Sequence, residues 1–385
     1  MSQNKTLLEF LDSKTLYYDK IDYDVINRSY EILSTHIQLP YVIHLIGTNG
    51  KGTTGRFLSS FLQQIDKSVL HYSSPHIIDF NERIWINGSN STDQELNNAH
   101  EQLQKILPSK YLVQLTYFEY TTLLAFLLSS DMDYIVLEAG LGGEFDATNV
   151  VENNLTLLTT VDLDHQDFLG DTVEEITATK VRSCNNSIII GHQINSEVYE
   201  TVQEQLKNIK SISKIEDYDT DISKYKEELP AYLIYNLKLA FSALKFLGID
   251  KKDFLLPKLE GRFQKLEDNI IVDVGHNKLA AKQICKQLQK ENKKYILIYN
   301  SYKDKDYKSI LNILKPVLKE LQIIRCDDSR MVDTAILEET ISQVDIKNKY
   351  FNIDDMIKDE NYLVFGSFIV VENFLKQYKG RLNEK

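Results

Sequence analysis

The sequence predicts an α/β protein with two domains, each built on a mainly parallel β-sheet. Short apolar runs rich in β-branched residues alternate with longer segments of helical period, as expected when helices connect parallel strands. This alternation is interrupted near Pro257 and Gly261 and then resumes. The 385 residues accommodate two domains at about 150 residues each. We therefore expect a larger domain over residues 1–256, a linker over 257–266 and a smaller domain over 267–385.

The first domain contains several short, continuously apolar runs, a pattern typical of strands buried on both faces. We expect strands at Tyr41–Ile46, Val69–Tyr72, Tyr134–Leu137, Leu155–Thr160 and Ile188–Ile190. Between the first two runs, Thr53–Ile65 places Phe57 and Phe61 on one helical face, which predicts a helix packed against the sheet. The polar segment Glu197–Leu229 shows neither pattern and yields no prediction.

The second domain repeats the alternation. We expect strands at Ile270–Val274, Tyr295–Tyr299, Gln322–Arg325 and Tyr362–Phe365. We expect helices at Lys278–Glu291, Tyr307–Leu318, Ala335–Ser342 and Phe368–Tyr378. A strand-and-helix series of this kind predicts a second α/β layer structure with its own core.

Composition and charge exclude several classes of protein. With 44 Lys and Arg against 56 Asp and Glu, the net charge of −12 argues against nucleic-acid binding and against attachment to an anionic membrane surface. The 3 cysteines form no CxxC pair, so neither a disulfide framework nor a zinc knuckle is indicated. The most apolar stretch, Thr121–Ser130, is far shorter than the ~20 residues of a membrane span. We expect a cytoplasmic protein.

The segment GTNGKGTT, residues 47–54, stands between a predicted strand and a predicted helix. Closely spaced glycines allow backbone N–H groups to surround a phosphate, the helix N-terminus favours anions, and Lys51 supplies a cation. The usual phosphate loop has Gly where Leu45 stands, and here Gly52 separates the lysine from the hydroxyl residue. A glycine-rich turn can also be only a tight connection, but the strand and helix around it favour phosphate binding. The residues of this candidate phosphate site are Thr48, Asn49, Gly50, Lys51, Gly52 and Thr53.

Ionisable side chains follow two other predicted strands. Glu138 ends one strand and is followed by Ala-Gly-Leu-Gly-Gly, while Asp164 and His165 follow the next. Ligands of doubly wound sheets bind at the carboxyl ends of the strands, so Glu138 is a candidate Mg²⁺ ligand. It can equally be a strand-end residue that caps a helix or faces water. His165 is an unusual Mg²⁺ ligand, and Lys180 by itself reads as a surface lysine.

In the second domain, polar residues surround the end of the first strand. Asp273 and His276 follow that strand, and Arg262 lies in the predicted linker. Ligands frequently bind in clefts between domains, so these residues are candidate ligand contacts. The competing interpretation is a strand-end turn capped by Asp and Asn side chains.

Taken together, the motifs resemble the folylpolyglutamate synthase and dihydrofolate synthase family of the Mur ligase superfamily. The segments that carry the resemblance, in order, are GTNGKGTT, YSSPH with ERI, FEYTT, VLEAGLGGEFDATNV, LDHQDFLGDT, GRFQ and DVGHN. The resemblance extends from about Lys20 to about Phe374 and is weakest over Glu197–Leu229 and the last hundred residues. It implies an N-terminal P-loop ATPase-type domain and a smaller, Rossmann-like C-terminal domain.

The resemblance also implies a chemistry. Members of this family phosphorylate a carboxylate with the γ-phosphate of ATP, and the amino group of L-glutamate then attacks the acyl phosphate. The implied cofactors are ATP and one or two Mg²⁺ ions, and the implied substrates are dihydropteroate, folates and L-glutamate. The family further suggests a monomer.

Residue by residue, the resemblance implies three sets of contacts. Metal binding is implied for Ser74, Glu138, His165 and, as a carbamate, Lys180. Further nucleotide contacts are implied for Asn236, Arg262, Asp273 and His276. Contacts with the pterin substrate are implied for Ile21, Asp22, Tyr23, Phe118, Phe145, Asp146 and Ala147. Around the lysine, the family commonly has Glu-Lys-Ala-Gly where this chain has Thr179–Arg182, so carbamylation of Lys180 is a hypothesis.

We predict an enzyme with both activities, dihydrofolate synthase and folylpolyglutamate synthase. The alternatives are a folylpolyglutamate synthase with one activity, or a Mur-type ligase that adds an amino acid to another carboxylate. A nucleotide-dependent regulatory module is a third alternative, but it would not need the set of Ser74, Glu138, His165 and Lys180.

Overall fold

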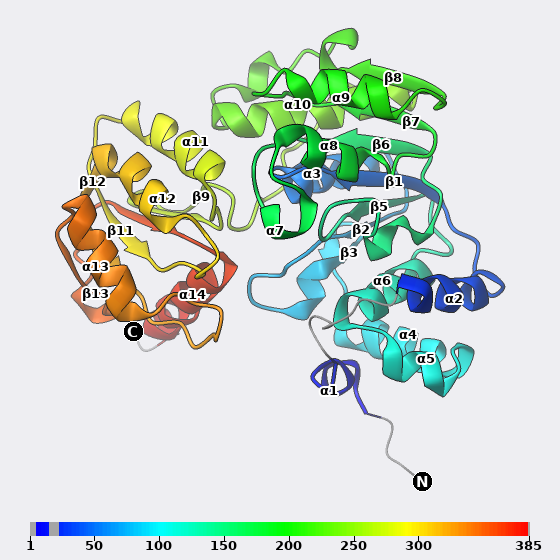
Figure 1. Ribbon diagram of the computed structural model, residues 1–385, viewed down its shortest axis with the longest axis horizontal. Helices are drawn as coiled ribbons and strands as arrows, with labels where there is room; N and C mark the ends of the chain where they lie inside the picture. The colour runs from blue at the N-terminus through cyan, green and yellow to red at the C-terminus, as the bar shows by residue number, and fades with distance from the viewer. Residues whose placement is uncertain (1–4, 15–22, 384–385) are drawn as a thin grey trace. The chain divides into compact units, whose positions relative to one another are not determined.

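The structure, a computed structural model, describes residues 5–14 and 23–383. The chain divides into two compact units (Figure 1). Unit 1 contains the chain up to Lys226 together with Leu233–Pro257, and unit 2 contains Glu227–Tyr232 and the chain from Lys258 onward. Each unit has its own sheet, and both sheets are mainly parallel, which confirms the predicted α/β class.

Within the described residues, unit 1 holds an eight-stranded sheet in the order β4-β3-β2-β5-β1-β6-β7-β8. The strands are β1 Tyr41–Ile46, β2 Val69–Tyr72, β3 Ile84–Ile86, β4 Ser89–Asn90, β5 Tyr134–Glu138, β6 Leu155–Leu158, β7 Ser187–Ile190 and β8 Ser211–Lys214. β3 and β4 pair antiparallel at one edge, whereas β1 lies between parallel neighbours. Loops that leave the carboxyl ends of β1, β5 and β6 therefore emerge side by side.

The helices of unit 1 cover its sheet (Figure 1). They are α1 Leu7–Leu11, α2 Tyr23–Ser34, α3 Lys51–Gln63, α4 Asp93–Ile106, α5 Ser109–Gln114, α6 Tyr117–Leu128, α7 Gln166–Leu169, α8 Val173–Val181, α9 Glu197–Gln205 and α10 Ala231–Phe246. Helix α6 is apolar on nearly all sides, so it is a core helix rather than a surface helix. None of the described helices combines the length and the apolar character that a membrane span requires.

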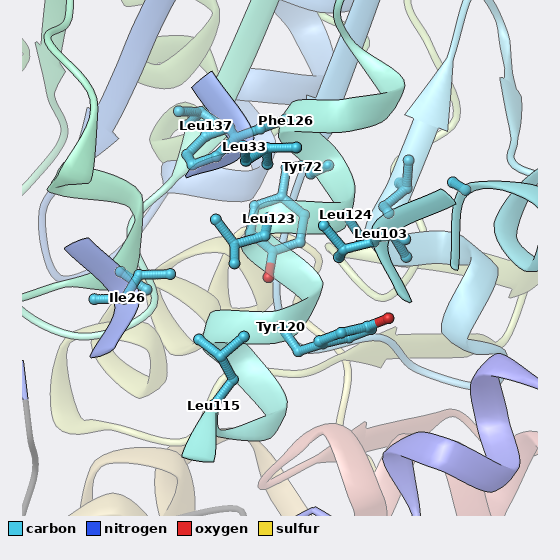
Figure 2. Close-up of a cluster of buried hydrophobic side chains, with 14 of the residues drawn as sticks. Ile26, Leu33, Tyr72, Leu103, Leu115, Tyr120, Leu123, Leu124, Phe126 and Leu137 are labelled. Atoms are coloured by element: carbon cyan, nitrogen blue, oxygen red, sulfur yellow. The ribbon is translucent and has the colours of Figure 1, made fainter. Parts of the chain in front are cut away.

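The core around α6 combines helix and strand side chains (Figure 2). Leu123 and Phe126 are fully buried, as is Tyr72 of β2. Burial of a leucine or phenylalanine side chain of this kind stabilises the fold by roughly 2 kcal/mol. This packing fixes α6 against β2, which ends two residues before the predicted site residue Ser74.

The segment Glu197–Leu229, whose structure could not be predicted, forms α9 and the edge strand β8. β8 reads Ser-Ile-Ser-Lys and pairs with β7 on one side only. Edge strands need no continuous apolar run, because one side of the strand is left to solvent, and this explains why the run was absent.

In the described part of unit 2, a six-stranded sheet has the order β13-β12-β11-β14-β10-β9. Its strands are β9 Gln264–Glu267, β10 Ile270–Asp273, β11 Tyr295–Tyr299, β12 Leu318–Ile323, β13 Asn348–Tyr350 and β14 Tyr362–Phe365. Its helices are α11 Lys278–Gln289, α12 Tyr307–Leu314, α13 Thr334–Val344 and α14 Phe368–Asn383. β9 pairs antiparallel with β10, and the other pairs are parallel.

The predicted boundaries on either side of Pro316 were wrong. The helix predicted over Tyr307–Leu318 ends at Leu314, and β12 covers Leu318–Ile323 rather than Gln322–Arg325. Pro316 explains both differences, since it has no backbone N–H to continue an α-helix and stands in a short 3₁₀ turn. The chain thus reaches the sheet earlier than the apolar run alone suggested.

Candidate functional site

The glycine-rich loop lies between β1 and α3, as the sequence predicts. Gly47 has φ +137° and Gly50 has φ +99°, a range in which side chains with a Cβ are strained. Gly50 is the N-cap of α3, whose first residue is Lys51. The Lys51 Nζ donates to the Gly47 carbonyl at 3.1 Å, so the lysine folds back over its own loop.

Hydrogen bonds and the packing of one side chain hold this loop in place. The Thr48 hydroxyl donates to the Asp162 carbonyl at 2.9 Å, and the Thr48 and Asn49 N–H groups both donate to the Thr160 carbonyl. A Cβ built on Gly50 would lie 2.4 Å from Oδ1 of Asn236, so this asparagine of α10 sits against the loop. The loop is therefore fixed by residues that follow β6 and by α10, and Asn236 joins it from 186 residues away in the sequence.

A carboxylate stands beside the loop lysine. Glu138, the last residue of β5, is 7% exposed, and its Oε1 lies 4.0 Å from the Lys51 Nζ. Its Oε2 accepts from the Ser74 N–H at 3.3 Å, and a Cβ on Gly52 would come within 3.1 Å of the same oxygen. Glu138, Lys51 and Ser74, all predicted site residues, thus lie together at one edge of the sheet.

Lys180 is part of the same neighbourhood. It lies near the end of α8 and is only 4% exposed, so the interpretation as a surface lysine was wrong. Burial lowers its pKa to about 7, and the nearby Lys51 ammonium adds to this effect. Asp164 and Asp146 act in the opposite direction, which places both carboxylates within electrostatic reach of the amine.

The loop after β5 is tied to α8. Glu144 donates its N–H to the Thr179 carbonyl at 3.0 Å and accepts from Arg182 Nε at 2.6 Å. A Cβ on Gly143 would lie 2.4 Å from the Lys180 carbonyl, so glycine is required for this approach. Arg182 belongs to the segment Thr179–Arg182, where the sequence departs from the Glu-Lys-Ala-Gly that the resembling family commonly has. In this structure it pairs with Glu144, which follows the glycines of the loop.

Asp146 organises the glycine loop from within. Its carboxylate accepts from the Leu141 N–H at 2.8 Å, from the Thr148 N–H at 3.0 Å and from the Thr148 hydroxyl at 2.6 Å. Burial raises the pKa of this carboxyl group, and these hydrogen bonds counteract the rise. The adjacent Phe145 is 60% exposed, whereas Ala147 is buried.

Phe118 lies beneath the start of this loop. Its ring stacks on Tyr72 with centroids 5.7 Å apart. A Cβ on Gly140 would lie 2.7 Å from the Phe118 ring, so this residue and the glycine loop are in contact. Ile21 and Asp22 lie outside the described residues, and Tyr23 is the first residue of α2.

The loop after β6 presents His165. This residue has φ +53° and is the N-cap of α7, and its N–H donates to Asp164 Oδ1 at 3.0 Å. No group of three or more His, Cys, Asp or Glu side chains that could hold a metal occurs in the described part of the chain. The donors that are present suit Mg²⁺, which commonly takes one or two carboxylates and completes its shell with water and substrate phosphates.

In unit 2, the predicted residues Arg262 and Asp273 form a cluster of their own. Asp273, at the end of β10, accepts from the Phe263 and Gly275 N–H groups at 2.8 Å and from the Tyr232 hydroxyl at 3.2 Å. Burial raises its pKa, and Arg262 acts against the rise. The Arg262 guanidinium lies over the Phe368 ring at 5.1 Å. Sequence reasoning missed Tyr232, because nothing in the spacing relates it to a strand end 41 residues away.

His276 and the next residue begin α11. Nδ1 of His276 contacts the Val274 carbonyl at 3.1 Å. Asn277 is the N-cap of α11, and its side chain accepts from the Ala280 N–H at 3.0 Å. The competing interpretation, a turn capped by an asparagine, therefore holds for Asn277.

Comparison with known proteins gives three informative matches, although no family model matches the chain. The chain is 32% identical to a dihydrofolate synthase/folylpolyglutamate synthase of Haemophilus influenzae, over 87% of this chain and 88% of that one. It matches the Helicobacter pylori folylpolyglutamate synthetase structure at 36% identity and a TM-score of 0.79, covering 97% and 98% of the two chains. A Yersinia pestis bifunctional folylpolyglutamate synthase/dihydrofolate synthase complexed with AMPPNP and Mn shares the fold, at 22% identity, 97% coverage of both chains and a TM-score of 0.79. The chain belongs to the dihydrofolate synthase/folylpolyglutamate synthase family.

Proposed function

We propose that this protein is an ATP-dependent ligase that joins L-glutamate both to dihydropteroate and to the γ-carboxylate of tetrahydrofolate glutamates. One observation carries the proposal. The phosphate-loop lysine Lys51, the buried carboxylate of Glu138 and the buried amine of Lys180 converge at one edge of the unit 1 sheet. In a chain of this family, that arrangement supports transfer of a phosphoryl group from ATP to a carboxylate.

The reaction needs activation of the acceptor because a carboxylate is a poor electrophile at neutral pH. A carboxylate oxygen attacks the γ-phosphorus of ATP, the bond to ADP breaks, and an acyl phosphate forms. The glutamate amine then attacks the acyl carbon, loses a proton, and phosphate departs with the original carboxylate oxygen. Enzymes of this type act mainly by alignment and charge neutralisation, and alignment can contribute ~7–11 kcal/mol.

Residues of unit 1 can provide both effects. The N–H groups of the first turn of α3 stand at a helix N-terminus, where anions are favoured. Lys51 already lies over the loop and would neutralise charge on the transferred phosphate. Thr53, in the first turn of α3, is proposed to lie near the metal.

Mg²⁺ fits the donors of this site and, when bound, would neutralise phosphate charge during transfer. We propose that Ser74, Glu138 and His165 hold it, with phosphate oxygens and water completing the shell. Glu138 lies against the Ser74 backbone, which supports these two as neighbours in one site. The structure gives no cage of three ionisable ligands among its described residues, in keeping with an ion that binds together with the nucleotide.

Carbamylation of Lys180 remains a proposal. An uncharged amine adds CO₂ and releases a proton to give a carbamate, which is an oxygen ligand for Mg²⁺. The burial that lowers the pKa of Lys180 to about 7 leaves part of the amine uncharged near neutral pH. A mass of the intact protein that shows the free amine under active conditions would remove Lys180 from the metal site.

The remaining residue assignments also stay proposals. For the nucleotide they are Asn236 in unit 1 and Arg262, Asp273 and His276 in unit 2. For the pterin they are Ile21, Asp22, Tyr23, Phe118, Phe145, Asp146 and Ala147. We further propose a cytoplasmic monomer that does not bind nucleic acid, a view supported by the net charge of −12.

One assay tests the function. Purified protein with ATP, Mg²⁺ and L-glutamate receives either dihydropteroate or tetrahydrofolate, and ADP and amide product are measured. Turnover of both acceptors is the expected result, and turnover of tetrahydrofolate alone would leave a folylpolyglutamate synthase with one activity. Turnover of neither acceptor would refute the proposal and favour a Mur-type ligase with another substrate or a nucleotide-binding module.

A further inference from the structure

Two aromatic rings stack between the segment after β7 and helix α10, and the reaction proposed above does not use them. The rings of His192 and Tyr235 lie face to face, with centroids 3.8 Å apart and planes inclined by 11°. Tyr235 belongs to α10, and His192 follows β7 by two residues (Figure 1 labels both elements). Tyr235 is 41% exposed although one face of its ring is covered. A substantial part of Tyr235 therefore stays accessible to a ligand.

Both residues are connected to the phosphate loop. The carbonyl of His192 accepts from the Thr160 hydroxyl at 2.9 Å, and the Thr160 carbonyl in turn accepts from two N–H groups of the loop. Tyr235 directly precedes Asn236, whose side chain packs against Gly50 of the loop. His192 is thus linked to the loop through one hydrogen bond to Thr160, and Tyr235 is the chain neighbour of a residue that packs against the loop.

A nucleotide bound at this loop must place its base on some nearby surface. We infer that Tyr235, backed by His192, is a stacking surface for the purine base of the nucleotide, and hence a positioning residue for it. The inference rests on the proposed nucleotide-dependent function. Aromatic side chains bind bases through their π-faces, and a ring already held in place loses little entropy when a base covers it.

The His192 side chain suits the supporting role. Burial lowers the pKa of this imidazole, Lys238 adds to that effect, and Glu216 opposes it. The ring is therefore mostly uncharged near neutral pH, and an uncharged ring can be covered without desolvating a charge. Stacking is also tolerant of the base, so Tyr235 would contribute affinity rather than a choice between adenine and guanine.

Calorimetry with two probes tests this inference, namely ADP and inorganic tripolyphosphate, which lacks a base. Tyr235→Ala should weaken ADP binding by about 5- to 100-fold and leave tripolyphosphate binding unchanged. Tyr235→Phe should bind ADP within about twofold of wild type, because it keeps the ring. Tyr350→Ala is the matched control, since Tyr350 is 46% exposed and lies on β13 of unit 2, and it should bind both probes normally.

A fluorescent variant covers the case in which Tyr235→Ala fails to fold. The chain has 1 tryptophan, Trp85, which is 7% exposed, so Tyr235→Trp adds a second, more exposed fluorophore. ADP should quench its emission and tripolyphosphate should not. Unchanged ADP affinity in Tyr235→Ala, equal weakening of both probes, or no quenching in Tyr235→Trp would overturn the inference. Wild-type protein that binds no ADP would instead refute the proposed function.

Discussion

Replacing Gly52 by alanine should affect the stability of the phosphate-loop helix and the position of Glu138 in ways that can be measured independently. Gly52 is the second residue of α3, and its backbone does not require glycine, since its φ is not in the positive range. A Cβ there would lie 3.1 Å from Oε2 of Glu138, whereas ordinary contact begins at 3.4 Å. The carboxylate must then retreat by 3.4 − 3.1 = 0.3 Å.

The expected effects on stability and activity have opposite signs. Alanine favours helix over glycine by up to about 1 kcal/mol, so the free energy of unfolding should stay constant or rise by that amount. Misplacement of a catalytic group by about 1 Å can cost ~100-fold in rate, so a shift of about a third of that should cost roughly fivefold. The loss should be largest at low Mg²⁺ concentration, since Glu138 is a proposed metal ligand.

The measurements are urea unfolding and ADP release over a series of Mg²⁺ concentrations. Gly380→Ala is the matched control, because Gly380 lies in α14 with no atom within 4 Å of a built Cβ. It should show a similar change in stability and full activity. Wild-type activity and Mg²⁺ dependence in Gly52→Ala would refute the reasoning that couples this position to Glu138.

Three further predictions concern unit 1. Burial lowers the pKa of His44 from 6.5 to about 4, so between these pH values the imidazole is protonated in the unfolded chain but not in the native chain. As the pH falls from 6.5 to about 4, the free energy of unfolding should therefore fall by ~1.4 kcal/mol per pH unit. His44→Gln should show a flatter pH dependence in urea unfolding, and a slope identical to that of the wild type would contradict this. Arg182→Glu should lower kcat/KM for the pterin substrate, because the new carboxylate repels Glu144. Adding Glu144→Arg should restore kcat/KM. If the single and the double variant have the same kcat/KM, the pair has no role. Thr116→Ala removes the N-cap hydroxyl that accepts from the Glu119 N–H and should cost ~1 kcal/mol of stability without changing KM for ATP, so a changed KM would contradict a purely structural role.

Much of the fold could be predicted because buried parallel strands are continuously apolar. Tyr41–Ile46, Val69–Tyr72 and Tyr295–Tyr299 occur as predicted for this reason. The antiparallel strands β3 and β4 at one end of the first sheet, and β9 at one edge of the second, were not predicted, since they are short and lie at the margins of their sheets. Local apolar pattern carries little information about such strands.

Only part of the candidate site could be predicted from the sequence. The loop around Lys51 followed from residue types and spacing alone, because phosphate binding imposes a local pattern. The contact of Asn236 with Gly50 joins distant segments, and only the family resemblance pointed to that asparagine. The burial of Lys180 could not be read from its helix, since burial depends on how α8 packs. The pairs Arg182–Glu144 and His192–Tyr235 likewise arise from tertiary packing.

The most direct measurement of the proposed chemistry follows an oxygen atom. Dihydropteroate labelled with ¹⁸O in its carboxylate is incubated with the protein, ATP, Mg²⁺ and L-glutamate, and the released phosphate is analysed by mass spectrometry. If the site formed around Lys51 and Glu138 phosphorylates the acceptor, each product phosphate carries one ¹⁸O. Amide formation with unlabelled phosphate would contradict an acyl phosphate intermediate.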